Sequence, residues 1–143
     1  MRLLSAAMLV LLAAGGAAVA DGQALFDENC SPCHQKGGIG TPGLAPPLVS
    51  DALKNAAAKQ PDYVPLVVLN GMSGKIEVAG QTFFSAMPAQ PQLPDESIAA
   101  IAGYVLGALN GGNVSIDAVK VAALRNPKVG HAKLRNLRAE LAK

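Results

Sequence analysis

The sequence predicts an all-α domain made of short helices. Apolar residues recur at helical spacing in several stretches, and most of the glycines and prolines gather between these stretches. One stretch, residues 74–84, alternates in a way that suggests extended chain. A chain with this pattern is expected to fold as helices joined by long loops, with a small hairpin at the alternating stretch.

Three helices are expected in the first half of the chain. The first begins at Gly22 and places Leu25 and Phe26 on neighbouring turns. A loop rich in glycine and proline follows over residues 37–47. The valines of the third helix are spaced for one face. The expected helices span residues 22–30, 51–59 and 61–71.

The second half contains the hairpin and the longest helix. The hairpin turn is expected near Ala79-Gly80. The helix over residues 94–109 begins with two acidic residues, whose charge suits a helix N-terminus, and it ends at a pair of glycines. Its apolar stripe consists of Ile98, Ile101, Ala102, Val105, Leu106 and Leu109.

Residues 1–20 have the features of a secretory signal peptide. Arg2 gives a basic start, residues 3–14 are an apolar run, and small residues lead up to Ala20, as at a cleavage site. The alternative, an uncleaved membrane anchor, needs roughly twenty apolar residues, more than this run offers. We expect cleavage after Ala20 and export to the periplasm.

Cys30-Ser31-Pro32-Cys33-His34 is the most informative stretch of the chain. Two thiols at this spacing can each bond to a vinyl group of one haem, and the imidazole that follows can bind the iron. The alternatives are a thioredoxin-like dithiol and half of a zinc site, but the sequence has only two cysteines. We therefore expect covalently attached haem c, with Cys30 and Cys33 as attachment points and His34 as an iron ligand.

From about residue 21 to residue 110 the chain resembles the class I cytochromes c, in their monohaem periplasmic bacterial form. Gly22, Phe26 and Cys30 follow one another at four-residue intervals, as in the first helix of that family. Ile101 and Tyr104 stand where its last helix crosses the first. The resemblance implies a fold in which short helices wrap around one covalent haem.

The same resemblance implies roles for two residues outside the cysteine motif. Pro46 stands where the family has a proline whose carbonyl oxygen accepts a hydrogen bond from Nδ1 of the haem histidine, here His34. Residues 81–89 resemble the family's Met-Pro loop, which makes Met87 the distal iron ligand. Met72, in a glycine-flanked loop, is the rival thioether, and His131 is the remaining imidazole. The proline after Met87 stiffens its loop and favours it over Met72.

Residues 114–143 form a basic extension behind the expected haem domain, residues 21–113. Apolar spacing around Asn126-Pro127 predicts one or two amphipathic helices. Residues 21–119 have four lysines and nine acidic residues, a net charge of −5, whereas residues 120–143 have seven Lys or Arg and one Glu, a net charge of +6. The extension could dock on an acidic partner and steer its approach, lie on anionic lipid or fold back on its own domain. Its basic residues around His131, Arg138 included, are expected to form a solvated face. The extension has no aromatic side chain on which a base could stack, which argues against nucleic acid as a partner.

These features predict an electron-transfer protein with no catalytic residues rather than an enzyme. Imidazole and thioether together fill both axial positions of a haem iron. The expected partners of this monomeric carrier are redox proteins: a dehydrogenase, a reductase or a terminal oxidase. One alternative is a tightly bound cytochrome subunit of a periplasmic dehydrogenase or reductase complex. Residues 71–84 resemble a glycine-rich insert that is found in cytochromes of such complexes. The other is a haem-based sensor or peroxidase-like protein with an open distal site.

Overall fold

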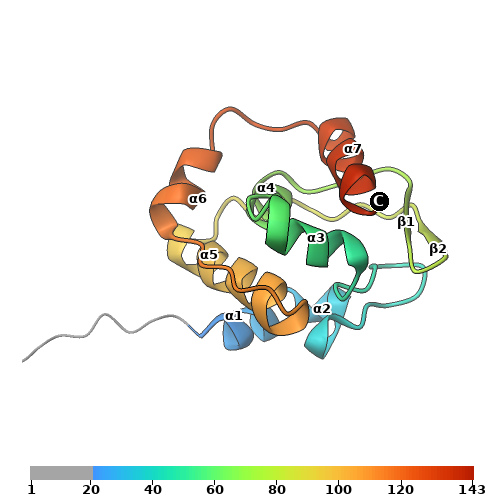
Figure 1. The fold of residues 1–143 in the computed structure, drawn as a ribbon, viewed down its shortest axis with the longest axis horizontal. Coiled ribbons are helices and arrows are strands. Elements are labelled where there is room, and N and C mark those ends of the chain that lie inside the picture. Colours follow the sequence, from blue (N-terminus) through green and yellow to red (C-terminus); the bar gives the residue numbers. More distant parts are fainter. Residues whose placement is uncertain (1–20) are drawn as a thin grey trace, which may run out of the picture.

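The computed structural model describes residues 21–143, in which short helices are joined by long loops (Figure 1). The expected leader, residues 1–20, lies outside the described residues. The prediction of a mostly helical chain with a small hairpin is confirmed. The elements in chain order are α1 (Gly22–Asn29), α2 (Ser31–His34), η1 (Lys36–Gly38), α3 (Asp51–Lys59), α4 (Tyr63–Asn70), β1 (Ile76–Val78), β2 (Gln81–Phe83), α5 (Asp95–Gly103), η2 (Tyr104–Leu109), α6 (Ala118–Leu124) and α7 (His131–Leu141).

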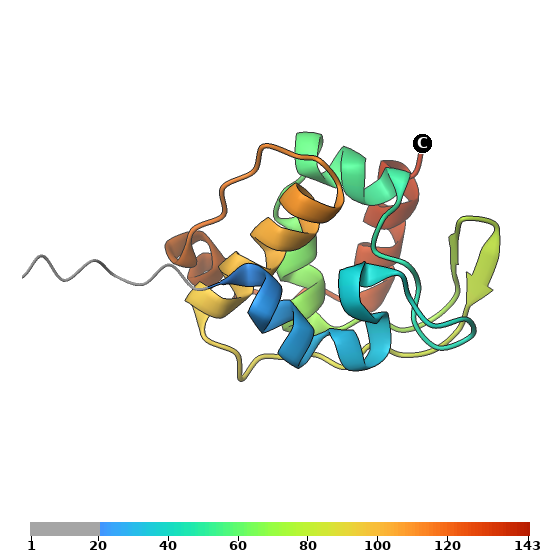
Figure 2. The same cartoon turned by 90° about the horizontal axis from the view of Figure 1, so that it is seen from below.

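α1 crosses the long helix formed by α5 and η2 at close range (Figure 2). The Asp21 carboxylate caps α1 by accepting hydrogen bonds from two backbone N–H groups of its first turn, at 3.0 and 3.3 Å. Gly22 lies at the crossing, where a Cβ atom would be 2.2 Å from the carbonyl oxygen of Ala100. One turn later, the ring centroids of Phe26 and Tyr104 are 5.3 Å apart. This crossing fixes the end of α1 and therefore the start of the cysteine motif.

α5 continues into η2, a π-helical turn. The sequence predicted one uniform helix over residues 94–109, but the chain winds more widely from Tyr104 onward. The side chain of Asn110 closes this wider turn, because its Nδ2 donates to the carbonyl oxygen of Val105, five residues back, at 2.8 Å. The same Nδ2 donates to the carbonyl oxygen of Leu48 at 2.7 Å. Asn110 thereby ties the helix end to the loop before α3.

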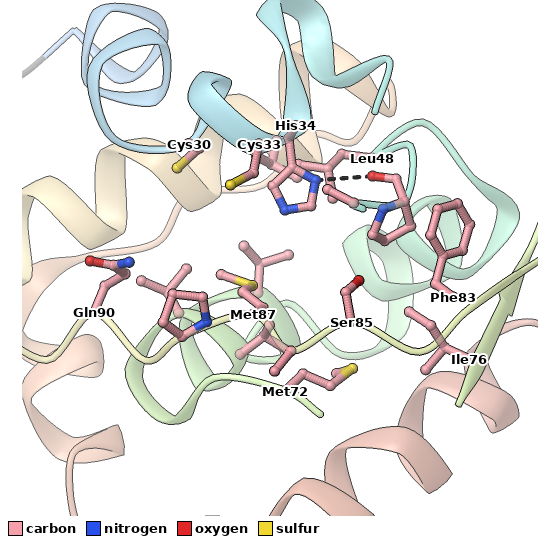
Figure 3. Close-up of a pocket in the computed structure, with 18 of the residues that line it drawn as sticks. Cys30, Cys33, His34, Leu48, Met72, Ile76, Phe83, Ser85, Met87 and Gln90 are labelled. Atoms are coloured by element: carbon pink, nitrogen blue, oxygen red, sulfur yellow. Dashed lines mark hydrogen bonds between the residues drawn. The ribbon is translucent and has the colours of Figure 1, made fainter. Parts of the chain in front are cut away.

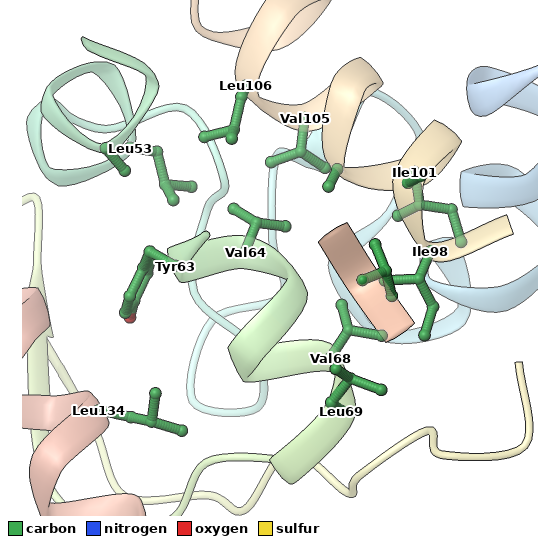
Figure 4. Packing of buried hydrophobic residues seen from close by; sticks show 14 of the residues in the cluster. Leu53, Tyr63, Val64, Val68, Leu69, Ile98, Ile101, Val105, Leu106 and Leu134 are labelled. Carbon is green, nitrogen blue, oxygen red and sulfur yellow. The ribbon is translucent and has the colours of Figure 1, made fainter. Parts of the chain in front are cut away.

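α4 runs through the centre of the core, where side chains of α3, α5, η2 and α7 surround it (Figure 4). Val64 and Val68 are buried on its predicted apolar face, and Val67 is half-buried. The stripe predicted on the long helix is buried as well, apart from the half-buried Leu109. The predicted faces therefore meet in one apolar cluster.

β1 and β2 form the expected antiparallel hairpin, in which Ile76 pairs with Phe83. Its turn falls at Ala79 and Gly80, whose φ angles are 51° and 76°. Two consecutive positive φ angles are typical of the two-residue turns that suit the twist of a hairpin. The predicted turn position is therefore confirmed.

The segment after residue 113 folds back on the rest of the chain through two helices (Figure 1). α6 packs on α5, and α7 packs on α3 and α4. Lys120 Nζ lies 3.1 Å from a carboxylate oxygen of Asp62, and a guanidinium nitrogen of Arg125 lies 2.7 Å from one of Asp95. Within residues 21–143, no helix combines the length and the apolar character that crossing a membrane requires.

The prediction that the basic residues around His131 form a solvated face is wrong for Arg138, whose side chain is only 8% exposed. Leu134, Arg138 and Leu141 follow one another at four and three residues, so they share the inner face of α7. His131 is itself held by a hydrogen bond of 2.6 Å between its Nδ1 and the hydroxyl of Ser73. α7 is therefore an integral part of the packed structure.

We expect Leu134→Ala to lower the free energy of unfolding by about 2–5 kcal/mol, the usual effect of truncating a buried leucine. Leu134 is fully buried in the central cluster. Val119→Ala is the control, because this α6 side chain is 81% exposed and its loss should change stability by less than about 0.5 kcal/mol. Urea unfolding followed by circular dichroism gives both values. Equal stability of the two variants would contradict the assignment of α7 to the cooperative core.

Candidate functional site

A deep cleft separates two walls of the molecule (Figure 3). α2 and the loop after it form one wall, and α4 with residues 85–88 forms the other. The cleft has a volume of about 180 Å³, counted as the space that the centre of a water molecule can reach. A cavity that holds one buried water has about 10–15 Å³ when it is counted in the same way. The cleft is thus far larger than a packing defect. Most of its lining is apolar and includes Phe26, Leu48, Val64, Val68, Phe83 and Ile101.

Cys30 and Cys33 lie on the α2 wall. Cys30 stands between α1 and α2, and Pro32 occupies the first turn of α2, where a missing backbone N–H does no harm. This short turn brings both thiols to the edge of the cleft on the same side as His34 (Figure 3). Both cysteines are free thiols, and Cys33 is the more exposed. A group that fills the cleft would meet both sulfur atoms along one edge.

His34 is buried at the end of α2 and faces the cleft. Its Nδ1 lies 2.9 Å from the carbonyl oxygen of Pro46. A carbonyl can only accept, so Nδ1 carries the proton and Nε2 points into the cleft with a free lone pair (Figure 3). Burial lowers the pKa of His34, the hydrogen bond to Pro46 acts in the opposite direction, and the charge of Arg138 lowers it further. The ring is therefore neutral at neutral pH, the form in which imidazole binds a metal.

The loop between η1 and α3 holds the Pro46 carbonyl in place. The Thr41 hydroxyl donates to the carbonyl oxygen of Cys33 at 2.8 Å. The backbone N–H of Leu48 donates to the carbonyl oxygen of Gly38 at 2.7 Å. The carbonyl oxygen of Leu48 in turn accepts the Asn110 amide described above. The orientation of His34 therefore depends on contacts that reach from α2 to the end of η2.

Met72 and Met87 lie together on the opposite wall. Their backbones exchange two hydrogen bonds, of 3.0 and 2.7 Å, in an antiparallel pair. Side chains of directly opposed residues in such a pair point to the same face, and both methionines line the cleft. In Figure 3 the Met87 sulfur points toward the side that holds His34, whereas the Met72 side chain runs toward Ile76. The third candidate, His131, is not among the residues that line the cleft.

Two backbone contacts fix the segment that carries Met87. The backbone N–H of Gln90 donates to the carbonyl oxygen of Val68 in α4 at 2.8 Å. Gly71 allows the close pairing with residue 72, because its φ is 70° and a Cβ atom there would lie 2.6 Å from the Met87 carbonyl oxygen. The Met87 loop is thus attached to both ends of the last turn of α4.

Cys30 does not have the lowered pKa of a reactive redox thiol. Burial, with a smaller contribution from Cys33, raises the pKa of Cys30 to about 11. Reactive thiols of dithiol enzymes have a lowered pKa, because the thiolate is the nucleophile. In residues 21–143 no three His, Cys, Asp or Glu side chains come together in an arrangement that could hold a metal ion by themselves. Both thiols line the cleft and are available for covalent attachment to a group that fills it.

The sequence analysis did not identify Tyr63 and Arg138 as residues of the cleft. Tyr63 is 2% exposed at the start of α4, and Arg138 enters from α7. A signal for Arg138 was present, since it lies at helical spacing between Leu134 and Leu141. Its charge and its basic neighbours favoured a surface position instead.

Comparison with known proteins places the chain among cytochromes. Residues 17–105 match the family described as cytochrome c oxidase, cbb3-type, subunit III. Two proteins of Thermus thermophilus named cytochrome c-552 are 37% identical over 103 residues and 38% identical over 89 residues. The first match covers 68% of this chain and 68% of the relative, and the second covers 60% and 66%. The fructose dehydrogenase cytochrome subunit of Gluconobacter japonicus is 34% identical over 120 residues, which are 80% of this chain and 24% of that subunit.

We expect Gly71→Ala to reduce the free energy of unfolding more than Gly80→Ala does. Both glycines have positive φ, but Gly71 combines a φ of 70° with a ψ of −178°, a backbone conformation essentially restricted to glycine, so an alanine at position 71 is already strained by about 1–3 kcal/mol. A Cβ atom at Gly80 meets open space, whereas one at Gly71 meets the Met87 carbonyl oxygen. Overpacking of this kind typically adds about 1–3 kcal/mol. Urea unfolding of both variants measures the difference, and equal values would show that the Met87 pairing yields without strain.

Proposed function

Because this chain belongs to the class I c-type cytochrome family, we propose that it carries single electrons through one haem c ligated by His34 and Met87. Membership of the family makes it an electron-transfer cytochrome that uses haem c. The number of haems, the two axial ligands and the role as a free carrier are the proposal. The observation that carries it is the placement of His34 and Met87 on opposite walls of one apolar cleft, with Cys30 and Cys33 beside His34.

The residues present fit this cofactor. When bound, haem c supplies an iron that gains and loses one electron. Cys30 and Cys33 would hold it through thioether bonds along one edge of the cleft, and apolar side chains would cover both faces and exclude water. His34 would present Nε2, oriented by the Pro46 carbonyl, which also makes the imidazole a better donor. Met87 would present its thioether from the opposite wall.

The proposed ligand pair favours a carrier over a catalyst. His34 and Met87 together would occupy both axial positions, so neither face would be left for oxygen or another small ligand. A thioether ligand raises the reduction potential relative to a second imidazole. The walls that carry the two ligands are tied into helices that pack on one core, so little rearrangement is expected on electron transfer.

A specific observation supports a second candidate, a cytochrome subunit held in a dehydrogenase complex. One of the similar proteins is named as a dehydrogenase cytochrome subunit, and the chain matches 24% of its length. The two candidates share the haem site and differ in whether the protein leaves its electron donor between reactions. The redox partners of a free carrier meet it briefly, over a small contact area.

We expect the protein from a periplasmic extract to elute alone in size-exclusion chromatography, with an intact mass equal to residues 21–143 plus one haem. The mass tests cleavage after Ala20 and the haem count together. Co-elution with a dehydrogenase or reductase would favour the subunit candidate. Recovery in the membrane fraction with residues 1–20 attached would contradict the expected cleavage after Ala20 and make residues 1–20 a membrane anchor.

We expect Met87→Ala to abolish the weak near-infrared band of iron–thioether ligation, to lower the reduction potential and to allow carbon monoxide to bind. Each effect follows from the loss of the distal thioether. Met72→Ala is the matched control, since it truncates the same side chain on the paired segment of the same wall. It should keep the band and exclude carbon monoxide.

Optical spectra of the ferric proteins and carbon monoxide titration of the ferrous proteins provide the measurement. Loss of the band in Met72→Ala alone would make Met72, and not Met87, the distal iron ligand. Binding of carbon monoxide to the unaltered protein would contradict the carrier proposal and favour a sensor or peroxidase-like protein.

A further inference from the structure

Arg138 is a buried charge at the edge of the cleft. It is 8% exposed and lies on the inner face of α7 between Leu134, which is fully buried, and Leu141, which is 6% exposed. It also lines the cleft that the haem is proposed to fill. A guanidinium keeps its charge at any ordinary pH, so this charge cannot be relieved by loss of a proton.

Arg138 has no anionic partner among residues 21–143. Its Nε is buried without any hydrogen-bond partner. Among residues 21–143, none of the ion pairs includes Arg138, and no Asp or Glu belongs to the lining of the cleft. The last turn of α7 offers carbonyl groups of partial negative charge, but the unpartnered Nε shows that they do not satisfy the side chain. Burial of an unpaired charge is strongly unfavourable, so the cleft requires an anion here.

Tyr63 completes a pair of hydrogen-bond donors. It is 2% exposed, and in Figure 4 its hydroxyl points toward α7, from which Leu134 enters the core. Burial raises the pKa of Tyr63, while the charge of Arg138 and a hydrogen bond with it act in the opposite direction. The Arg138 guanidinium and the Tyr63 O–H are both hydrogen-bond donors. Arg138 and Tyr63 can therefore bind one carboxylate together.

α7 is fixed at both ends, so Arg138 is held in position. At the C-terminal end, the amide Nδ2 of Asn55 in α3 donates to the carbonyl oxygen of Leu141 at 2.8 Å. At the N-terminal end, His131 contacts the hydroxyl of Ser73 and the carbonyl oxygen of Asn70, at 2.6 and 3.1 Å. A donor on such a helix loses little freedom when it binds its partner.

We propose that Arg138, with Tyr63, binds a carboxylate side chain of the haem, and that the C-terminal helix is therefore part of the haem site. The inference rests on the proposed function, because it takes the haem as the occupant of the cleft. Arg138 acts here as a positioning and charge-compensating residue. Its positive charge near His34 should favour the ferrous over the ferric state and so raise the reduction potential.

Apart from Tyr63, the charged and titratable groups around Arg138 are exposed, lie on the facing wall or face other segments. The charged residues of α3, which packs against α7, are exposed, and His131 faces the loop after α4. The remaining charged groups of α7 are exposed or half-buried outside the lining of the cleft. The charged or titratable groups in question are Asp51, Lys54 and Lys59 of α3, Tyr63 of α4, Cys30, Cys33 and His34 of the facing wall, and His131, Lys133, Arg135 and Glu140 of α7 itself.

The test is a redox titration of the matured holoprotein over a range of pH, for wild type, Arg138→Met, Arg138→Lys and Lys133→Met. Lys133→Met is the matched control, because it removes one charge from an exposed position of the same helix. Arg138→Met should lower the midpoint potential relative to wild type and control. It should also steepen the dependence on pH, since a carboxylate without its counter-charge takes up a proton more readily on reduction. Arg138→Lys, which keeps the charge and loses the planar fork, should lie between wild type and Arg138→Met.

The outcomes separate the inference from its alternatives. A midpoint and pH profile of Arg138→Met equal to those of Lys133→Met would overturn the inference, even if the protein were less stable. If Arg138→Met fails to mature, a wild-type profile in Arg138→Lys under all conditions would overturn it equally. A potential of the wild-type protein that shifts with chloride or phosphate at constant ionic strength, with the shift lost in Arg138→Met, would assign the anion to the solvent instead. Absence of a reversible one-electron transition in wild type would overturn the proposed function itself.

Discussion

The hydrogen bond between His34 Nδ1 and the Pro46 carbonyl is the contact on which the candidate site depends. It fixes the tautomer of the imidazole and the direction of Nε2. A backbone carbonyl can hold that position only if its loop is rigid, and the loop has no regular structure of its own. Rigidity comes from side chains at its two ends: the Thr41 hydroxyl ties it to α2, and the Asn110 amide ties it to the end of η2. The π-helical turn is thus linked to the orientation of one imidazole nitrogen.

The two walls of the cleft are built by different means. The wall of His34 is part of a helix that follows directly from α1, whose position is set by the Gly22 crossing and the Phe26–Tyr104 contact. The Met87 side of the cleft combines α4 with irregular chain, which is held by the backbone pair of Met72 and Met87, by the Gln90 N–H donating to Val68 and by the Ser85 hydroxyl donating to Leu44. One candidate ligand therefore sits on a helix, whereas the other sits on a loop that depends on hydrogen bonds to neighbouring segments.

Local sequence patterns predicted what depends on local structure. The bounds of α3, the hairpin turn at Ala79-Gly80 and the apolar stripe of the last helix follow from spacing and turn chemistry. What the patterns missed depends on contacts between distant residues: the amide of Asn110 that closes η2, and the pairing of residue 72 with residue 87. Arg138 was misplaced because the charge of its neighbours outweighed a helical spacing that correctly indicated burial. A buried arginine between two leucines is recognised as such only once the cleft beside it is known.

The fold also changes the meaning of the charge asymmetry along the chain. Seven basic residues after position 119 suggest an extension that attracts acidic partners, but four of them, Lys120, Arg125, Arg135 and Arg138, are engaged within the protein. Lys120 and Arg125 meet acids of the preceding part of the chain, and the Arg125 guanidinium also donates to the carbonyl oxygens of residues 91 and 93. Arg138 points inward. Exposed ion pairs contribute little to stability, but they cancel the fields of both partners at a distance. The long-range attraction of the extension is therefore weaker than the sequence suggests, because much of its positive charge is paired with nearby acids or buried within the fold.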